Sequence, residues 1–403
     1  MTKVTIGLVR EGRVPPDKRV PFTPLQVQEI LQLFPNVGVA CQHSEVRCFS
    51  DAEYASLDIP ILNDMSKCDI LMGIKEVQIP DLIAGKTYLF FSHTLKKQPY
   101  NRKLLQEILR NKIRLIDYEA LRDIQGNRIV AFGRYAGIVG AFNGLWTYGK
   151  RFGLFELRRA CECFDINDLK LELRKVKLPP VKILLTGAGR VAKGAMETLD
   201  TVGIRKVSPE DYLNKVFDYP VYVQLNSADY HVRKEGGPFN RDEFHKYPGN
   251  YISTFKPFTG VTDLLLAGAY WNPKAPALFT LQDMKEKTFR IRVIADITCD
   301  INGSVPSTKR ATSIVDPLYD YDPIADKELP PLSGKDYITV MAIDNLPCEL
   351  PRSASEEFGR DLIDRVLRPL LQDDPEGVIA RGTIARDGQL TPHFDYLKDY
   401  VAE

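Results

Sequence analysis

The sequence lacks the features that would mark a membrane protein, a secreted protein or a nucleic-acid-binding protein. Its formal net charge is only +1, so no excess of basic residues favours nucleic acid or an anionic membrane as a partner. Its longest apolar stretches, such as residues 181–189, are far shorter than a membrane span. The first residues have neither the long apolar core of a signal peptide nor the composition of a transit peptide. We therefore expect a cytoplasmic protein.

Cysteine is also too sparse and irregular to form a scaffold. The seven cysteines are odd in number and show no framework spacing, which is typical of a reducing compartment. Only Cys161 and Cys163 form a tight pair, and no histidine lies near them in the sequence. We expect no structural metal. Repeats at a solenoid period and low-complexity segments are absent as well.

What the sequence does contain is enough apolar residues for two or three domains. The 403 residues are 44% hydrophobic and 27% charged. In the first third, strand-like runs alternate with amphipathic helical patterns. We predict strands over 4–11, 68–76, 86–94 and 113–119, and helices over 23–34, with a Thr-Pro start, and 99–112. This alternation predicts an α/β fold with a largely parallel sheet.

The rest of the chain predicts a second unit of the same class. A helix over 135–154 is rich in small residues, and Gly137, Ala141 and Gly144 would let another backbone approach closely. Further strands are predicted over 181–187, 289–298 and 336–347, and a helix that begins at a Ser cap over 353–372. Residues 226–257 are polar and turn-rich, so we interpret them as an irregular insertion.

The strongest single motif follows the strand that ends near Thr186. Gly187, Gly189 and Ala192 fit the G-x-G-x-x-A fingerprint between a strand and a helix. The first Gly turns the chain and the second lets the backbone approach a pyrophosphate, while the small third residue packs the helix on the strand. We therefore predict a dinucleotide site, although a Gly-rich turn alone can be an ordinary tight turn.

The motif does not decide between NAD and NADP. An acidic residue that binds the ribose is expected about 20 residues after the loop. That region instead holds Arg205 and Lys206, with Glu210 following. The two basic residues could bind a 2′-phosphate, and Glu210 could bind a ribose hydroxyl.

Two predicted strands of the first unit each deliver a base, Lys75 and His93. Taken alone, each would be a solvated or structural residue. Ligands of open α/β sheets bind outside the carboxyl ends of the strands, however, and further charged residues occur at these ends. They are Arg10, Arg19, Glu76, Lys96 and Glu119. The cations suit substrate carboxylates, and bases beside cations have lowered pKa values, so that they can exchange protons near neutral pH.

The motifs together resemble a known family. "DKRVPFTP", "GIKEV", "FFSHTLKKQ", "IRLIDYEALRDIQGNRIVAFGRYAGIVG", "LTGAGRVAKGA", "ADITCDINGSV" and "AIDNLPCELPRSASEEFG" occur in family order through nearly the whole chain. In these segments the sequence resembles the lysine–2-oxoglutarate reductase (saccharopine dehydrogenase, lysine-forming) branch of the alanine dehydrogenase/transhydrogenase superfamily. The resemblance implies condensation of lysine with 2-oxoglutarate and reduction of the imine by NAD(P)H to saccharopine.

The resemblance also implies a role for each matching residue. Lys75 and His93 would be the acid–base pair, and Arg19 and Arg128 would bind substrate carboxylates. Glu76 and Glu119 would tune the pair and hold the substrate amine. Asp300 matches a functional Asp of alanine dehydrogenases, or it caps a turn. The cofactor would contact Gly187, Gly189, Arg190 and Val191, and the loop Ile343, Asp344, Asn345 and Leu346.

The implied architecture is two Rossmann-like lobes with parallel sheets and an active-site cleft between them. Residues 1–139 and 345–403 would form the substrate domain, and residues 140–344 the dinucleotide-binding domain. Two alternatives stay open: an alanine dehydrogenase or opine-type enzyme of the same superfamily, and a catalytically silent dinucleotide-binding regulator. In each enzymatic case the partners are small-molecule substrates, and family members range from monomers to hexamers.

Overall fold

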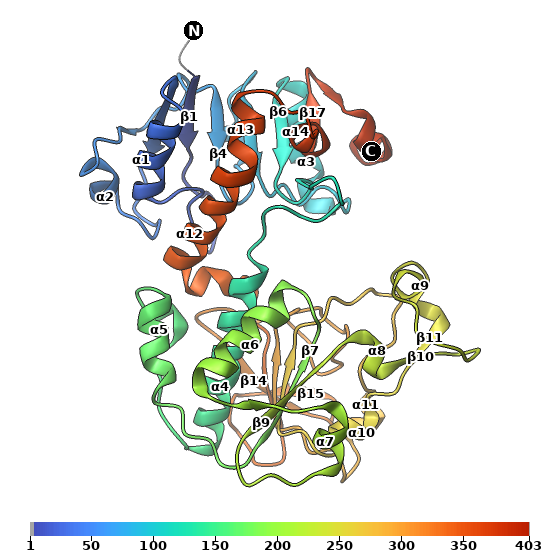
Figure 1. Cartoon of the computed structure of the whole chain (residues 1–403). Helices are drawn as coiled ribbons and strands as arrows, with labels where there is room; N and C mark the ends of the chain where they lie inside the picture. Colours follow the sequence, from blue (N-terminus) through green and yellow to red (C-terminus); the bar gives the residue numbers. More distant parts are fainter. Residues whose placement is uncertain (1–3, 403) are drawn as a thin grey trace. The chain divides into compact units, whose positions relative to one another are not determined.

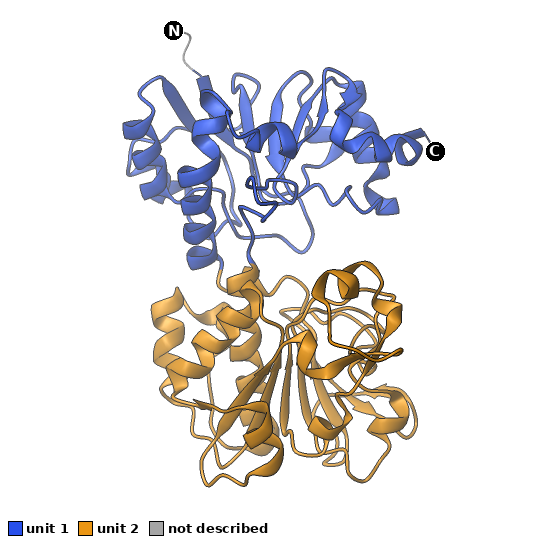
Figure 2. Ribbon diagram, turned by 45° about the vertical axis from the view of Figure 1, so that its right-hand side comes forward, with its two compact units in different colours: residues 1–132, 351–403 blue, residues 133–350 orange. Residues whose placement is uncertain are grey.

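The chain is divided into two compact units. The computed structural model describes residues 4–402 (Figure 1). Unit 1 comprises residues 1–132 and 351–403, and unit 2 comprises residues 133–350 (Figure 2). Both boundaries coincide with the first residue of a helix, α4 (Gly133–Phe152) and α12 (Pro351–Leu362). Each of these helices therefore belongs entirely to one unit, whereas the predicted boundaries at 139/140 and 344/345 lie inside α4 and before α12.

Unit 1 is built on an eight-stranded sheet in the order β18-β17-β6-β5-β4-β1-β2-β3. Its first six strands along the chain pair in parallel, whereas β17 pairs antiparallel with β6 and with β18. The strands are β1 (Val4–Leu8), β2 (Val37–Gln42), β3 (Ile61–Leu62), β4 (Ile70–Met72), β5 (Thr87–Phe90), β6 (Arg114–Asp117), β17 (Thr383–Arg386) and β18 (Gln389–Leu390).

Both faces of this sheet are buried. In β4, Ile70 and Met72 join one apolar core, whereas Leu71 joins the core on the opposite face. Such two-sided burial explains why the strands appear in the sequence as continuous apolar runs. Helices α1 (Pro24–Leu33), α12 and α13 (Arg368–Leu371) lie in front of the strands in Figure 1. The other helices are α2 (Asp51–Ala55), α3 (Arg102–Arg110), α14 (Val378–Gly382) and α15 (Lys398–Ala402).

Two helices of unit 1 test the local signals in the sequence. The predicted Thr-Pro start is confirmed, because the Thr23 hydroxyl accepts a hydrogen bond from the backbone N–H of Gln26 and the Gln26 side chain accepts one from Thr23. The predicted helix over 353–372 begins earlier, at Pro351. It contains a π-helical turn over Ile363–Leu367 before it continues as α13.

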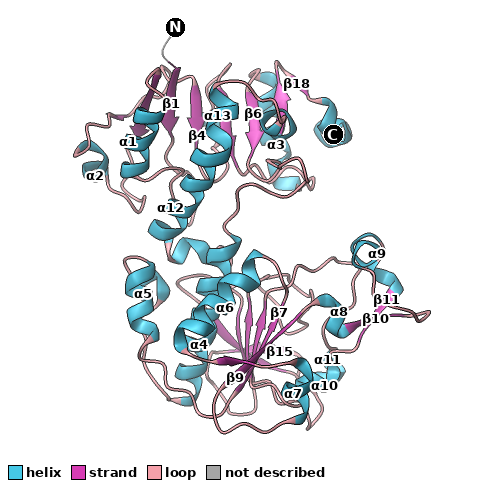
Figure 3. Ribbon diagram, in the orientation of Figure 1, coloured by secondary structure: helices cyan, strands magenta, loops and turns pink. Residues whose placement is uncertain are grey.

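Unit 2 has its own eight-stranded sheet in the order β15-β14-β16-β13-β12-β7-β9-β8 (Figure 3). Six strands pair in parallel, and β14 and β15 are antiparallel. The strands are β7 (Lys182–Thr186), β8 (Arg205–Lys206), β9 (Val221–Leu225), β12 (Leu264–Ala267), β13 (Val293–Asp296), β14 (Leu318–Asp322), β15 (Lys327–Leu329) and β16 (Ile338–Met341). Two mostly parallel sheets with helices confirm the predicted α/β class.

Glycines let the backbone of α4 approach α6 (Arg190–Val202). A Cβ on Gly137 would overlap the carbonyl oxygen of Val191, and one on Gly194 would overlap that of Arg134. The close approach predicted at Gly137 is therefore present, whereas a Cβ on Gly144 would meet side chains of the sheet instead, 2.7 Å from Leu266. Helix α5 (Ile166–Leu173) follows α4 along the chain.

The prediction of an irregular insertion over 226–257 was wrong. The segment forms helices α8 (Ser227–Tyr230) and α9 (Arg241–Lys246) and an antiparallel pair, β10 (His231–Arg233) with β11 (Tyr251–Ser253). Its aromatic rings pack together, with Phe244 4.5 Å from His231 and 5.2 Å from Tyr251 between centroids. The segment is aromatic as well as polar and turn-rich, and its aromatic residues are the ones that form this small core. Helices α7 (Pro209–Asn214), α10 (Lys256–Thr259) and α11 (Leu281–Met284) complete unit 2.

Candidate active site

The predicted dinucleotide loop has the required geometry within unit 2. Strand β7 ends at Thr186, and Gly187 adopts a φ of 106°, which an L side chain rarely adopts. Gly189 is the residue before the first turn of α6, and no atom lies within 4 Å of a Cβ placed there. Ala192 is fully buried beneath this turn. The loop therefore leaves open space at the N-terminus of a 13-residue helix, where backbone N–H groups favour an anion.

The other predicted cofactor residues follow neighbouring strands of the same sheet. Ile343 and Asp344 come directly after β16, and Asp300 lies in the loop after β13. Asp344 donates its backbone N–H to the Thr312 carbonyl at 3.1 Å, and Asn345 has a left-handed φ of 63°. Because β7, β13 and β16 are mutually parallel, all of these loops leave the same edge of the sheet.

The residues considered for the ribose do not all lie near the Gly loop. Arg205 pairs with Val221 at the start of β9 and stacks over the Tyr219 ring at 4.4 Å, far along the strand from Leu225, which pairs with Thr186. The ammonium of Lys206 does reach this end, 3.1 Å from Gln224 Oε1.

Strand β9 lies beside β7, the strand that leads into the Gly loop, and its residue Gln224 contacts that loop. Gln224 Nε2 donates to the Gly187 carbonyl at 2.7 Å. The residues that end β9 and follow it, Gln224, Leu225 and Asn226, include no acid. The acidic residue was expected about 20 residues beyond the loop. In this chain β8 and α7 occupy that stretch, because a short edge strand and a helix precede β9.

In unit 1, Lys75 and His93 lie on loops that follow two adjacent parallel strands. Strand β4 ends at Met72 and β5 at Phe90, so both bases come just beyond the strands rather than within them. Glu76 connects the two. Its Oε2 lies 3.0 Å from Nδ1 of His93, and its charge also acts on Lys75. His93 has a left-handed φ of 52°, uncommon for a residue with a Cβ.

The hydrogen bond to Glu76 fixes the proton on His93. Burial would raise the pKa of Glu76, but the hydrogen bond from His93 and the charges of His93 and Arg13 lower it below the ordinary value. An ionised carboxylate only accepts hydrogen bonds, so Nδ1 of His93 carries the proton that it donates. In the neutral imidazole this leaves Nε2 as the atom that can accept a proton.

Lys75 is partly buried among charges of both signs. Burial and the charge of Arg19 lower its pKa below the ordinary value, while Asp17 and Glu76 act in the opposite direction. Its backbone N–H donates to the carboxylate of Glu11 at 2.9 Å, and that of Ile74 donates to the same carboxylate at 2.6 Å. Burial and Asp17 raise the pKa of Glu11 to about 8.

Arg19 is held by an ion pair and by an aromatic ring. Its Nε and one Nη donate to the two carboxylate oxygens of Asp17 at 2.9 and 2.5 Å. The guanidinium also lies over the ring of Phe132, 4.0 Å from its centroid. Arg19 is 3% exposed, so this charge is fixed beside Lys75. Its predicted contact with a substrate carboxylate stays a prediction.

The loop after β6 carries Glu119, and it is tied to the loop of His93. Buried Asp117 accepts hydrogen bonds from the backbone N–H of Ser92 at 2.9 Å and from that of Glu119 at 2.6 Å, and also from the Ser92 hydroxyl. Glu119 forms a long ion pair of 3.8 Å with Arg128. Lys96 is exposed, and no side-chain hydrogen bond or ion pair joins it to another described residue.

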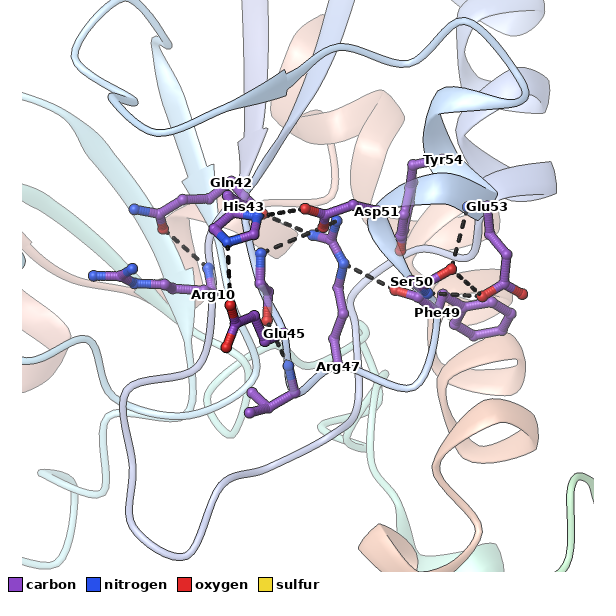
Figure 4. A network of polar contacts seen from close by, with 12 residues as sticks. Arg10, Gln42, His43, Glu45, Arg47, Phe49, Ser50, Asp51, Glu53 and Tyr54 are labelled. Atoms are coloured by element: carbon purple, nitrogen blue, oxygen red, sulfur yellow. Dashed lines mark hydrogen bonds and ion pairs between the residues drawn. The ribbon is translucent and has the colours of Figure 1, made fainter.

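A second polar network of unit 1 lies after β2 and joins His43, Arg47 and Asp51. Figure 4 shows His43 and Arg47 converging on Asp51, and the His43 Nδ1 to Asp51 distance is 2.5 Å. Arg47 also donates to the carbonyl oxygens of Gln42 and Phe49, both at 2.9 Å. The network closes the loop that precedes α2. Arg10, predicted to join the charged cluster, points its side chain away from this network.

Glu11, Asp17 and Asp117 are the residues that sequence reasoning missed. Each contacts a predicted site residue or its loop, yet each looked like an ordinary surface acid in the sequence. The one available signal was position, because Glu11 ends the strand predicted over 4–11 and Asp117 lies near the end of the one predicted over 113–119. Among residues 4–402 no group of three or more His, Cys, Asp or Glu side chains is arranged to hold a metal ion. In the same range no helix is long and apolar enough to span a bilayer.

The chain is similar to several known proteins. Residues 7–139 match the model of the alanine dehydrogenase/PNT N-terminal domain. The chain is 31% identical to alpha-aminoadipic semialdehyde synthase of Rattus norvegicus over 98% of its own length and 48% of the relative. It thus spans about half the length of this curated relative.

A second relative is covered more fully. Saccharopine dehydrogenase (NAD+, L-lysine-forming) of Neurospora crassa is 26% identical, with 87% of each chain covered. The solved structure of an L-alanine dehydrogenase superposes with a TM-score of 0.65 at 14% identity, covering 99% of this chain and 100% of the other. At that identity the superposition shows a shared fold.

Proposed function

We propose that the chain, which matches the alanine dehydrogenase/PNT N-terminal domain over residues 7–139, is an oxidoreductase that joins lysine to 2-oxoglutarate and reduces the resulting imine to saccharopine. The reaction acts on a C–N bond. The ε-amine of lysine adds to the ketone and water leaves to give the imine. A nicotinamide, bound at the Gly loop of unit 2, would supply the hydride to the imine carbon, and a proton completes the amine.

The observation that carries this proposal is the pairing of Lys75 with His93 through Glu76. A lysine whose pKa is lowered by burial and by Arg19 can release its proton and act as a base. His93, with Nδ1 held by Glu76, offers Nε2 for the second proton transfer. Forming and collapsing a carbinolamine requires two such transfers, one at oxygen and one at nitrogen.

The cations of the same loops support the substrate class. Both proposed substrates are amino or keto acids with carboxylates, and guanidinium groups bind carboxylates through two hydrogen bonds. Arg19 and Arg128 are the proposed ligands of these carboxylates, with Lys96 as an exposed third cation. Glu119, which faces Arg128 at 3.8 Å, would balance that charge until a carboxylate binds.

The geometry of the Gly loop is the reason for proposing the cofactor-binding residues. Gly187, Gly189, Arg190 and Val191 would hold the pyrophosphate at the N-terminus of α6, since the space at Gly189 is open. The loop from Ile343 to Leu346, and Asp300, would line the same strand edge. Either NAD or NADP satisfies these features. The proposal requires that the nicotinamide be presented to Lys75 and His93.

A substrate panel tests the proposal directly. The absorbance of the reduced cofactor, NADH or NADPH, should fall when lysine and 2-oxoglutarate are supplied together. It should not fall with either substrate alone. Lys75→Met and His93→Ala should each lower kcat by roughly a hundredfold. The exposed residues Lys67 and His245 provide matched controls, and Lys67→Met and His245→Ala should keep wild-type turnover.

Other outcomes of the panel would replace the proposal. Turnover with pyruvate and ammonia would assign an alanine dehydrogenase, and turnover with another amino acid and keto acid would assign an opine-type enzyme. Cofactor binding without turnover on any substrate would indicate a regulator. Wild-type turnover in both active-site variants would show that the Lys75 and His93 assignment is wrong.

A further inference from the structure

Unit 1 contains a cavity that the proposed reaction does not use. Its volume is about 420 Å³, and it lies beside the first residue of β6, between the sheet and the segment that includes α13 and α14. The residues proposed for catalysis follow the carboxyl ends of the strands, whereas Arg114, which lines this cavity, begins β6. The cavity is therefore at the opposite edge of the sheet from Asp117 and Glu119.

The side chains that line the cavity combine cations with apolar surface. Arg114, Arg386 and His393 contribute basic groups, Asp374 is the one acid, and Leu370 and Ile379 belong to the apolar part. The hydrogen-bonding capacity of the Asp374 carboxylate is already used within the protein. The carboxylate accepts three backbone N–H groups, from Val378 at 2.7 Å and from Ile379 and Ala380 at 3.0 Å.

Arg114 stands out among the arginines of the described chain. Five arginines have a buried Nε without a hydrogen-bond partner. Four of them are engaged elsewhere, by an aromatic ring, by an acid or by carbonyl oxygens: Arg102, Arg128, Arg151 and Arg159. Within residues 4–402, the Arg114 guanidinium has no hydrogen bond, ion pair or ring contact, and the carboxylates of Asp374 and Asp387 act on it only at a distance.

The buried Nε of Arg114 is costly, because its N–H has lost water without gaining an acceptor, and the rest of the guanidinium lines the cavity without a partner in the described part of the chain. Burial and the charge of Arg386 both disfavour its charged form, in the direction of a lowered pKa. Arg386 is itself mostly exposed and lies 3.3 Å from Asp387. The one acid of the lining, Asp374, is held by backbone N–H groups, so no carboxylate of the lining hydrogen-bonds to Arg114.

We propose that this cavity binds a small aliphatic carboxylate, with the carboxylate on Arg114 and Arg386 and the chain on Leu370 and Ile379. A carboxylate matches the fork of donors on a guanidinium, and it would give the Arg114 side chain the anionic partner that the described residues do not supply. The apolar lining selects against a fully hydrated anion such as sulfate. The inference is independent of the proposed reaction, because no residue of the cavity is assigned to catalysis.

Calorimetric titration of the full chain with pentanoate tests the site. We expect saturable binding to one site in the wild type, and roughly tenfold or greater weakening in Arg114→Met and in Arg386→Gln. Arg110→Gln, which changes an exposed arginine on α3, should bind pentanoate as the wild type does. Sulfate should bind more weakly than pentanoate.

Thermal unfolding provides the second measurement. Arg114→Met should unfold at a temperature no lower than the wild type without pentanoate, because it removes an unpaired charge. It should also lose the rise in melting temperature that pentanoate gives the wild type. The proposal is overturned if pentanoate does not bind saturably, if it binds Arg114→Met with wild-type affinity, or if sulfate binds more tightly than pentanoate.

Discussion

The carboxylate of Glu11 accepts a hydrogen bond of 2.9 Å from the backbone N–H of Lys75. Glu11 follows β1 and Lys75 follows β4, two neighbouring parallel strands. The same carboxylate accepts the N–H of Ile74 at 2.6 Å, so one side chain fixes two successive peptide groups of the loop that carries the proposed base. The other ionisable groups whose charges act on Glu11 or Lys75, or on which Glu11 acts, are Asp17, Arg19, Arg13, Glu76 and Tyr118.

Glu11 predicts a specific dependence of stability on pH. Its pKa rises from an ordinary 4.5 to about 8 in the folded chain, so the folded state holds a proton that the unfolded state releases. This contribution is complete below about 4.5 and is lost as the pH rises through about 8. Between these two pH values, each rise of one pH unit lowers the contribution of Glu11 to the free energy of unfolding by up to about 1.4 kcal/mol.

Urea denaturation across this pH range measures the effect. Glu11→Gln should flatten the decline in the free energy of unfolding, since an amide does not titrate. Glu235→Gln, which changes an exposed acid of unit 2, should keep the wild-type slope. If the wild type and Glu11→Gln have the same slope, the raised pKa of Glu11 is refuted.

A second prediction concerns the hydrogen bond between Glu76 and His93. Glu76→Gln keeps an oxygen that can accept from Nδ1 but loses the charge, whereas Glu76→Ala loses both. We expect kcat to fall roughly tenfold in Glu76→Gln and roughly a hundredfold in Glu76→Ala, because the imidazole loses its fixed proton position. Steady-state assays with lysine and 2-oxoglutarate measure this order, and equal activity of the two variants would contradict it.

A third prediction concerns the choice between the two dinucleotides. The ammonium of Lys206, a residue of β8, reaches Gln224 near the end of β9, where an acid would favour the ribose hydroxyls of NAD. The Asp229 carboxylate at this end accepts the backbone N–H of Asn226 at 2.6 Å, so the Lys206 ammonium is the group available to a 2′-phosphate, and we expect the chain to prefer NADPH. Lys206→Ala should lower kcat/KM for NADPH roughly tenfold and change that for NADH little. Arg205→Ala is the control, and an equal loss with both cofactors would disprove the assignment.

The sequence predicted those parts of the molecule whose signals are local. A strand followed by Gly187 and Gly189, or Thr23 before Pro24, is determined by neighbouring residues, and both patterns were read correctly. Glu11 and Asp117 were missed because their contacts are made with residues 63 and 25 positions away, and only the sheet brings them together. The same reason explains the misplaced ribose residues, because β9 rather than the next strand along the chain lies beside β7.

The fourth prediction separates cofactor binding from folding at two glycines. No atom lies within 4 Å of a Cβ at Gly189, whose φ of −81° any residue can adopt. Gly189→Ala should therefore fold with wild-type stability and yet bind the dinucleotide at least roughly tenfold more weakly, because the methyl group occupies the space of the pyrophosphate.

Gly137→Ala should behave differently, because its methyl group would overlap the carbonyl oxygen of Val191 in the first turn of α6. It must push α4 and α6 apart, so we expect a loss of about 1–3 kcal/mol in the free energy of unfolding together with weaker dinucleotide binding. Gly249→Ala, with its nearest atom at 3.9 Å, is the control for both measurements. Wild-type affinity in Gly189→Ala, measured by fluorescence titration with NADH and NADPH, would mean that the pyrophosphate does not approach this loop.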